Sequence, residues 1–242
     1  ILKHNNACGC ASRPTLLEAW TDALAGDPVS AFGGVLVANR PIDVATAREV
    51  DKLFVEVLIA PAFDPEALTI LEGKKNRILL RQKEAIDARW SYRSMLGGVL
   101  AQETDRAVET TAEMKCVTQV APTEAELTDL VFATKLVKHS KSNSIVLSKG
   151  GQLIASGVGQ TSRVDALKQA IEKARHFGFD LKGAVLSSDA FFPFDDCVTL
   201  AAEAGITAIA QPGGSVRDAD SIAAADRLGV AMVMTGVRHF KH

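Results

Sequence analysis

The sequence predicts an α/β fold of two lobes, each built from a sheet covered by helices. Strand-like and helix-like segments alternate along the whole chain, which is typical of this class. A length of 242 residues is enough for two small lobes that each bury a core. A polar stretch at residues 104–114 separates the two halves. We therefore expect the first lobe at residues 1–115 and the second at residues 120–242.

Composition excludes several classes of protein. The chain is 47% hydrophobic and 23% charged, with 18 Gly and 8 Pro, which is ordinary for a globular enzyme and unlike a disordered, collagenous or coiled-coil protein. The longest apolar runs have the length of a strand and fall well short of a membrane span. A net charge of −2 provides no general attraction for nucleic acid or anionic lipid. We expect neither a nucleic acid nor a membrane as partner.

The cysteines argue for a reduced, cytoplasmic protein. Only Cys8 and Cys10 are close together among the four, and such a pair without a second one is a weak zinc signal. A zinc site would have to use His4 with these two, but the spacing differs from that of zinc deaminases. The chain begins at Ile1 without a methionine, and we expect it to be a piece of a longer protein.

The first half begins with a helix at residues 14–24, whose apolar side chains Leu17, Trp20 and Leu24 recur at helical spacing. Asp64 followed by Pro65 indicates the cap and first turn of another helix. The other expected elements are a strand at 34–38, a helix at 43–54, a strand at 57–60, strands at 77–80 and 99–101, and loop-rich surface with one helical turn at 82–95.

The second half gives stronger local signals. Thr123 and Glu126 form a capping box at the start of a long helix. The glycine pair Gly150-Gly151 between two apolar runs predicts a hairpin. Ser162 caps a further helix. The expected strands lie at 144–147, 153–157, 184–187, 207–210 and 230–234, and the helix capped by Ser162 spans 163–177.

Two segments carry residues suited to acid–base chemistry. Lys3 and His4 place a cation and a titratable base at the end of a strand. The structural alternative is a salt-bridged lysine beside a solvated histidine. Asn143 lies among small polar residues at a helix-to-strand junction, where it could donate to a developing oxyanion. Helix capping would also account for that segment.

Other segments are suited to binding phosphate. Residues 157–163 end a strand and open a helix, where backbone N–H groups can hold an anion, but they lack a complete nucleotide-binding fingerprint. The glycine loops at 27–34 and 211–215 are either plain turns or sites of close approach to a ligand. The basic, aromatic end at 238–242 either binds a phosphate or is a frayed tail.

A loop rich in phenylalanine follows one of the later strands, at residues 188–196. Exposed aromatic rings there are costly unless they line a flat ligand. Packing into the core is the alternative, and the sequence favours neither.

Taken in order, these segments resemble one family of enzymes. The motifs are Lys-His-x-Asn-x-Cys-Gly, Asp-Pro-Val-Ser-Ala-Phe-Gly-Gly, Lys-Ser-Asn-Ser, Gly-Gln-x-Ser-Arg-Val-Asp, Ser-Asp-Ala-Phe-Phe-Pro-Phe, Gln-Pro-Gly-Gly-Ser and Arg-His-Phe-x-His. They are similar to the transformylase domain of the family that joins phosphoribosylaminoimidazolecarboxamide (AICAR) formyltransferase to IMP cyclohydrolase, and the match runs over residues 2–242.

The resemblance implies two cytidine-deaminase-like lobes with mixed sheets and without the deaminase zinc. It implies formyl transfer from 10-formyltetrahydrofolate to the 5-amino group of AICAR, in the synthesis of IMP. It also implies a homodimer whose active sites are shared between subunits, and a cyclohydrolase domain fused before this one.

The resemblance assigns roles to particular residues. The implied catalytic residues are Lys3, His4, Asn143 and His242. The implied substrate contacts are Gly33, Glu56, Phe191, Arg238, Phe240 and Arg163, the last lent by the partner subunit. Folate is implied to contact Asp196 and Asn143, and a supporting lysine to be Lys74 or Lys75. A monovalent cation, potassium, is implied near Ser142, Ser144 and Asp189.

The chain departs from the family pattern at several points. Ala7 stands where the family usually has proline, and Glu56 where it usually has aspartate. The Arg-Tyr-Gly segment that opens the transformylase domain is absent, so either the chain is a fragment or another chain supplies it. Two alternatives stay open, a zinc-dependent nucleoside or base deaminase and a non-catalytic module that binds nucleotide or folate.

Overall fold

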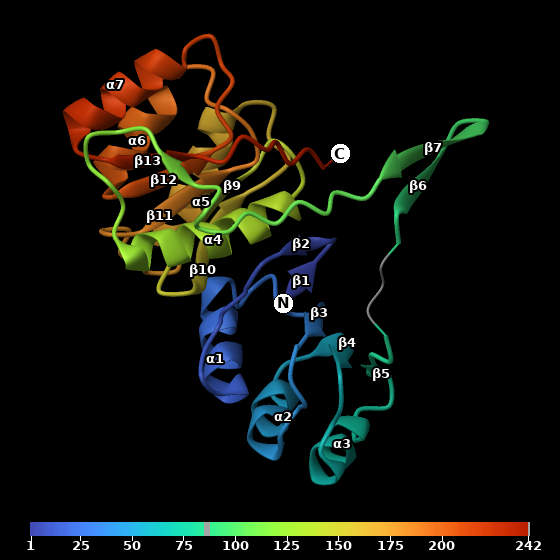
Figure 1. Ribbon diagram of the computed structural model, residues 1–242. Coiled ribbons are helices and arrows are strands. Elements are labelled where there is room, and N and C mark those ends of the chain that lie inside the picture. The colour runs from blue at the N-terminus through green and yellow to red at the C-terminus, as the bar shows by residue number, and fades with distance from the viewer. Residues whose placement is uncertain (85–87, 242) are drawn as a thin grey trace.

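The computed structural model describes residues 1–84 and 88–241 and has the α/β architecture with mixed sheets that the sequence predicts. A five-stranded sheet forms in the first half and a six-stranded sheet in the second, and a two-stranded hairpin projects away from both (Figure 1). Among the described residues, no helix combines the length and apolar character that crossing a bilayer requires.

The first sheet has the strand order β2-β1-β3-β4-β5. β1 is antiparallel to both of its neighbours, whereas β3, β4 and β5 are parallel to one another. The strands are β1 (Leu2–Lys3), β2 (Asn6–Ala7), β3 (Gly34–Val37), β4 (Val55–Ala60) and β5 (Ile78–Arg81), and the helices are α1 (Leu16–Gly26), α2 (Val44–Asp51) and α3 (Pro65–Glu72). The expected helices and the strands at β3, β4 and β5 are confirmed, with ends shifted by one to three residues.

Apolar packing holds the helices of this half against their sheet. Trp20 of α1 and Val50 of α2 share a buried cluster with Leu36 of β3 and Leu58 of β4. A capping box in which Thr15 pairs with Glu18 opens α1. The apolar spacing thus predicted the helix, and the cap fixes its first residue.

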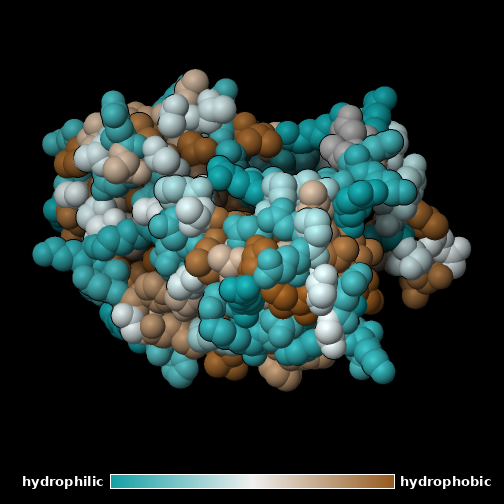
Figure 2. Space-filling view, turned by 90° about the horizontal axis from the view of Figure 1, so that it is seen from below, coloured by the Kyte–Doolittle hydropathy of each residue, from teal (hydrophilic) through white to brown (hydrophobic). Residues whose placement is uncertain are grey.

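The prediction for residues 82–95 was wrong. β6 (Trp90–Met95) and β7 (Gly98–Glu103) form an antiparallel hairpin, while residues 85–87 of that stretch lie outside the described residues. Every residue of the two strands is exposed. No buried face therefore imposes an alternation on the sequence, which explains why the strand at 90–95 gives little signal. Apolar side chains are visible on this projecting arm at the right of Figure 2.

The second sheet has the strand order β10-β9-β11-β12-β13-β8. β11, β12 and β13 are parallel, and β8, β9 and β10 pair antiparallel with their neighbours. The strands are β8 (Lys115–Cys116), β9 (Ile145–Lys149), β10 (Gln152–Gly157), β11 (Val185–Ser188), β12 (Ala208–Gln211) and β13 (Ala231–Met234), and the helices are α4 (Glu124–Lys138), α5 (Arg163–His176), α6 (Asp196–Ala204) and α7 (Asp218–Leu228).

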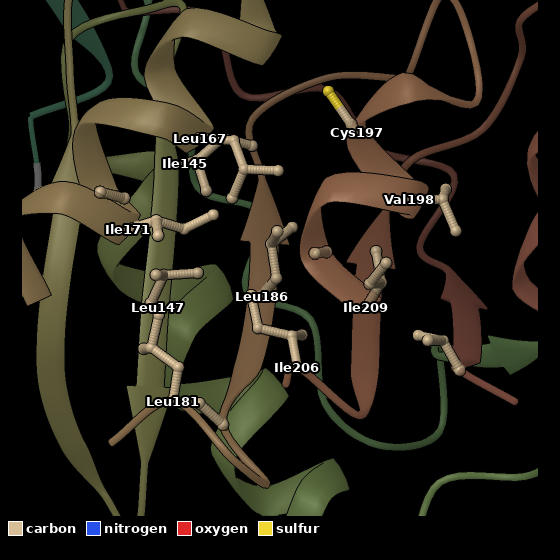
Figure 3. Close-up of a cluster of buried hydrophobic side chains, with 14 of the residues drawn as sticks. Ile145, Leu147, Leu167, Ile171, Leu181, Leu186, Cys197, Val198, Ile206 and Ile209 are labelled. Carbon is tan, nitrogen blue, oxygen red and sulfur yellow. The ribbon is translucent and has the colours of Figure 1, made fainter. Parts of the chain in front are cut away.

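Helices cover both faces of this second sheet. Alternate side chains such as Leu147, Leu186 and Ile209 pack under α5, α6 and α7, as Figure 3 shows. The intervening positions, such as Val185 and Ala210, pack against α4 on the other face. Burial on both faces explains why these strands read as continuous apolar runs rather than as alternating ones.

The first half of the chain also covers the outer edge of the second sheet. Leu153 N donates to Cys10 O at 2.8 Å and Ser12 N donates to Gly151 O at 2.9 Å. Arg13 Nη1 donates to Gly150 O at 2.7 Å. We call residues 10–13 the edge strap. It occupies backbone groups of β10 and of the preceding turn that would otherwise be open to pairing with another chain.

The predicted glycine hairpin is confirmed, and Asp129 of α4 holds its turn. Gly150 and Gly151 have φ values of 57° and 68°, which favour glycine, and both of their N–H groups donate to the Asp129 carboxylate at 2.6 Å. We expect Asp129→Ala to lower the free energy of unfolding by about 1–3 kcal/mol, because both donors lose their partner. Urea denaturation measures this. Asp129→Asn keeps one acceptor and should lose less, and equal midpoints for Asp129→Ala and the parent chain would contradict the role.

Candidate active site

The turn between β1 and β2 carries the predicted catalytic pair. Lys3 ends β1, and its Nζ donates to Phe32 O at 2.8 Å and to Gly33 O at 2.9 Å. His4 follows with a φ of 50° and an exposed side chain. A non-glycine residue in this conformation is uncommon, and such residues cluster at functional sites. The structure therefore brings Lys3 together with Gly33 and leaves the His4 imidazole accessible.

The loop at residues 139–144 lies against this turn. Lys141 N donates to Asn6 Oδ1 at 2.9 Å, which ties the loop to β2. Asn143 exchanges two backbone hydrogen bonds of 3.2 Å with Gln160, and its Nδ2 donates to Thr161 O at 3.2 Å. Within the described residues, these bonds leave one amide N–H and the amide oxygen of Asn143 available to a ligand.

The C-terminal segment at residues 238–241 joins the same place. Ser142 N donates to Lys241 O at 2.9 Å, and Lys241 N donates to Ser142 Oγ at 3.0 Å. The Lys241 ammonium donates to His139 O at 2.7 Å and to Asn5 O at 3.4 Å. Desolvation and then the nearby Arg93 lower the pKa of Lys241.

Three segments distant in sequence thus meet, and we call them together the three-segment site: the turn at residues 3–6, the loop at 139–144 and the segment at 238–241. In Figure 1 the C-terminal end lies above β1 and β2. His242, which the resemblance implies to be catalytic, lies outside the described residues.

The rings of the phenylalanine-rich loop differ in burial. Phe192 is fully buried in the core of the second sheet. The Arg238 guanidinium lies 4.7 Å from the centre of the Phe191 ring, and that of Arg217 lies 5.1 Å from the ring of Phe194. A Cβ at Gly214 would lie 3.2 Å from Arg238 Nη2, so the glycine loop approaches this cation closely. Packing into the core is therefore confirmed for Phe192, and the prediction that the other rings line a ligand stays a prediction.

A buried ion pair between Arg163 and Asp189 lies next to the 139–144 loop of the three-segment site. Arg163 Nη2 lies 3.1 Å from Asp189 Oδ1, and Asp189 Oδ2 accepts from Ser144 N at 3.1 Å. The Arg163 side chain is 11% exposed and that of Asp189 is fully buried. In the described part of the chain, Arg163 Nε and Ser144 Oγ are buried without a hydrogen-bond partner. Arg163 is therefore held by its own subunit.

These contacts bear on the implied potassium ion. The Arg163 guanidinium already neutralises Asp189, and Ser142 Oγ accepts from a backbone N–H. Ser144 Oγ is the single hydroxyl of the implied set that lacks a partner within the described residues. Potassium near these residues stays a prediction of the resemblance.

Some residues implied by the resemblance are tied elsewhere. Lys74 Nζ donates to Asp51 O at 2.6 Å at the end of α2, and Lys75 is exposed beside it. Glu56 is an exposed residue of β4. Asp196 is exposed at the start of α6, and its Oδ1 accepts from Cys197 N at 2.7 Å. Within the described residues, the hydrogen bonds of Lys74 and Asp196 do not reach the three-segment site.

The residues of the zinc alternative are separated. His4 lies at the turn of the β1–β2 hairpin, whereas Cys8 lies at its open end beside Ile1, where its Sγ is 3.6 Å from Ile1 O. Burial raises the pKa of the Cys8 and Cys10 thiols. In residues 1–84 and 88–241, no three His, Cys, Asp or Glu side chains gather in a way that could hold a metal ion.

The sequence did not single out His139 or His239 as candidate site residues. Desolvation and then the charges of Lys138 and Lys241 lower the pKa of His139, which favours a neutral ring beside the site. The available sequence signal was that the pair Lys138-His139 repeats Lys3-His4. His239 is buried between two carboxylates and had no signal of its own.

A cavity of about 440 Å³ lies away from these residues, between α1 and the first sheet. Its walls include Leu16, Trp20, Leu36 and Phe132, and it contains none of the predicted site residues. The candidate chemistry is therefore on the surface where the three segments meet, rather than in this apolar cavity.

Comparison with known proteins decides the family. The model of the family described as AICARFT/IMPCHase bienzyme matches residues 1–173. The chain belongs to this family. The resemblance carried by the sequence motifs is therefore confirmed.

Other members of the AICARFT/IMPCHase family are similar over the whole chain. A protein of Bacteroides thetaiotaomicron is 65% identical over 242 residues, covering 100% of this chain and 48% of the relative. A protein of Chlorobaculum parvum is 50% identical over 243 residues, covering 100% and 46%. Both are described as bifunctional purine biosynthesis protein PurH. The chain spans about half the length of these curated relatives.

Solved structures give partial likenesses. A dCMP deaminase from the cyanophage S-TIM5 is 20% identical, with a TM-score of 0.33, and covers 41% of this chain and 88% of its own. A deaminase/reductase from Thermotoga maritima is 25% identical, with a TM-score of 0.32, and covers 44% and 34%. Deaminases are thus among the structural neighbours, but the argument for the α/β fold comes from the two mixed sheets themselves.

Proposed function

We propose that this chain is the transformylase part of an AICAR formyltransferase, which moves a formyl group from 10-formyltetrahydrofolate to the 5-amino group of AICAR in the synthesis of IMP. The supporting observation is the convergence of the Lys3–His4 turn, the Asn143 loop and the C-terminal segment, in a member of the AICARFT/IMPCHase family. These three segments supply a base, hydrogen-bond donors and cations at one surface.

The reaction needs a base because the 5-amino group is a weak nucleophile, its lone pair being delocalised into the ring and carboxamide. In this proposal the His4 imidazole removes a proton as the amino nitrogen attacks the formyl carbon. The bond between that carbon and N10 of the folate then breaks, and N10 takes up a proton. The products are formyl-AICAR and tetrahydrofolate. The exposed His4 side chain at a tight turn is suited to this role.

The tetrahedral intermediate carries negative charge on the formyl oxygen, and Lys3 and Asn143 are the proposed donors to it. Two carbonyl oxygens hold the Lys3 ammonium in place, and a third N–H remains for the oxyanion. Asn143 retains an amide N–H of its own within the described residues. Fixed donors of this kind contribute about 10²–10³-fold each to the rate of acyl transfer.

Binding of the two ligands is assigned to different segments. Arg238, beside the glycine loop at 213–214, is proposed to hold the nucleotide phosphate by paired, charge-assisted hydrogen bonds. Phe191 and Phe240 are proposed to pack on the flat imidazole ring. Asp196 is proposed to contact the folate, and Glu56 the ribose.

The wider assembly is also a proposal. Relatives about twice as long suggest a cyclohydrolase domain in the complete protein, and we propose a cytoplasmic homodimer with shared active sites. In this chain the Arg163 Nη2 is bound to Asp189. If Arg163 contacts a ligand at the neighbouring active site, it therefore has to do so with guanidinium N–H groups that are not bonded to Asp189.

An assay with AICAR and 10-formyltetrahydrofolate, which follows the appearance of tetrahydrofolate, tests the proposal. Turnover supports it. A chain that binds both ligands by calorimetry but gives no turnover fits the non-catalytic alternative instead. Deamination of a nucleoside, together with about one zinc per site by metal analysis, would favour the deaminase.

The ligand assignments predict opposite effects for two substitutions. We expect Arg238→Ala to raise the dissociation constant for AICAR about tenfold or more, because phosphate loses a paired cationic donor, with little change for folate. Asp196→Ala should weaken folate first. Calorimetric titration of each variant with each ligand measures this, and equal losses for both ligands in both variants would refute the separate assignments.

A further inference from the structure

His239 lies in a buried clamp that the proposed chemistry does not use. Its Nδ1 is 2.6 Å from Asp105 Oδ2, and its Nε2 is 3.1 Å from both oxygens of Glu109. The side chains of His239 and Glu109 are 2% and 4% exposed. Each ring nitrogen of His239 therefore has a carboxylate as its hydrogen-bond partner. We call these three residues the His239 clamp.

A lysine lies beside the His239 clamp and contacts Asp105. Lys138, at the end of α4, lies with its Nζ 3.6 Å from Asp105 Oδ1 and donates to Ala107 O at 2.6 Å. Desolvation opposes ionisation of Asp105, but the hydrogen bond and charge of His239, and then the charge of Lys138, lower the pKa of its carboxyl group. The side chains of Lys138, Asp105, Glu109 and His239 thus form one connected cluster. They join the C-terminal segment to the stretch at 105–109 and to α4.

The clamp determines which way its neighbours face. Arg238 is exposed, His239 is buried and Phe240 is exposed, as expected for an extended segment whose side chains alternate. His239 N donates to Asp189 O at 2.9 Å, which fixes the backbone at the same point. With the imidazole held inward, the side chains on either side are directed outward, and Arg238 lies over the Phe191 ring.

We propose that His239, held by Asp105 and Glu109, is a positioning residue that aims Arg238 and Phe240 at the nucleotide. The inference rests on the proposed function, because it takes AICAR as the ligand of those two side chains. It adds a requirement that the ligand assignments do not contain. A buried cluster that links the C-terminal segment to residues 105–109 and to α4 sets the affinity for the nucleotide without touching it.

The test compares His239→Leu with the parent chain. We expect the KM and the dissociation constant for AICAR to rise about tenfold or more, equivalent to about 1.4 kcal/mol, with kcat and the KM for folate within about threefold. Hydrogen exchange of the amides at 237–241 should accelerate. His239→Gln keeps one donor and should recover part of the affinity.

Leu71→Ala is the control for general loss of stability, because Leu71 is fully buried in the first lobe. It should lower the stability without changing the KM for AICAR. If His239→Leu does not fold, Glu109→Gln removes one charge of the clamp and retains its shape, and it should raise the same KM. Unchanged AICAR affinity in a folded clamp variant would overturn the inference. A parent chain that binds no AICAR would instead refute the proposed function, while hydrogen exchange would still test the clamp.

Discussion

Replacing His4 with alanine is expected to reduce the rate of formyl transfer by about 10²–10⁴-fold, the usual contribution of a general base. The dissociation constant for AICAR should change little, because the phosphate and the imidazole are assigned to other side chains, Arg238 and Phe191, which contact each other. Single-turnover kinetics and calorimetry on the same preparations measure the two effects separately.

A matched control is available in His176, an exposed histidine in the last turn of α5. His176→Ala should retain the parent rate. A His4→Ala rate within about threefold of the parent would exclude His4 as the base and would direct attention to His139, whose pKa is lowered beside the same site.

Replacing Arg163 with leucine is expected to lower the free energy of unfolding by about 3–5 kcal/mol. The substitution removes the guanidinium but leaves the Asp189 carboxylate, which is fully buried, without its cation. Such an uncompensated charge is among the more costly defects in a protein interior. Denaturation in urea, followed by circular dichroism, measures the loss.

The double variant separates this ion pair from other roles of Arg163. Asp189→Asn removes the charge and retains an oxygen for Ser144 N, which donates to this side chain at 3.1 Å. Combined with Arg163→Leu, it should be less destabilised than the sum of the single variants by about 1–3 kcal/mol. Additive losses would mean that the two side chains are not coupled and that Arg163 is free to serve another site.

Local signals account for the parts of the fold that the sequence predicted well. The Thr123–Glu126 capping box and the Gly150-Gly151 turn involve residues close together in the chain, and the structure contains both. The buried strands of the second sheet were also found, because burial on both faces demands apolar residues at every position. In the hairpin at residues 90–103, the sequence predicted a strand at 99–101 but missed the one at 90–95. Both strands are exposed, so burial does not require apolar residues at their positions.

The candidate site could be predicted only as separate pieces. Lys3, Asn143 and Arg238 each stood out as residues suited to chemistry, but the motifs alone give no contact among them. The Arg163–Asp189 pair spans 26 residues and the His239–Glu109 contact spans 130. No helical or strand periodicity, and no helix cap, links residues that are so far apart in the sequence. Considered alone, each of these side chains could serve another role. Such contacts depend on how helices, strands and loops pack together, which tertiary structure alone supplies.

The edge strap also has a consequence for the order of folding during synthesis. Arg13 and its acceptor Gly150 are separated by 137 residues, so at about 5–20 residues per second the ribosome needs about 7–27 s to make the second after the first. During that interval the first sheet can assemble, but the backbone groups of Cys10 and Ser12 have no strand to pair with. The backbone groups of this short segment therefore remain hydrated until β10 has been made, and only then can the strap close on the second sheet.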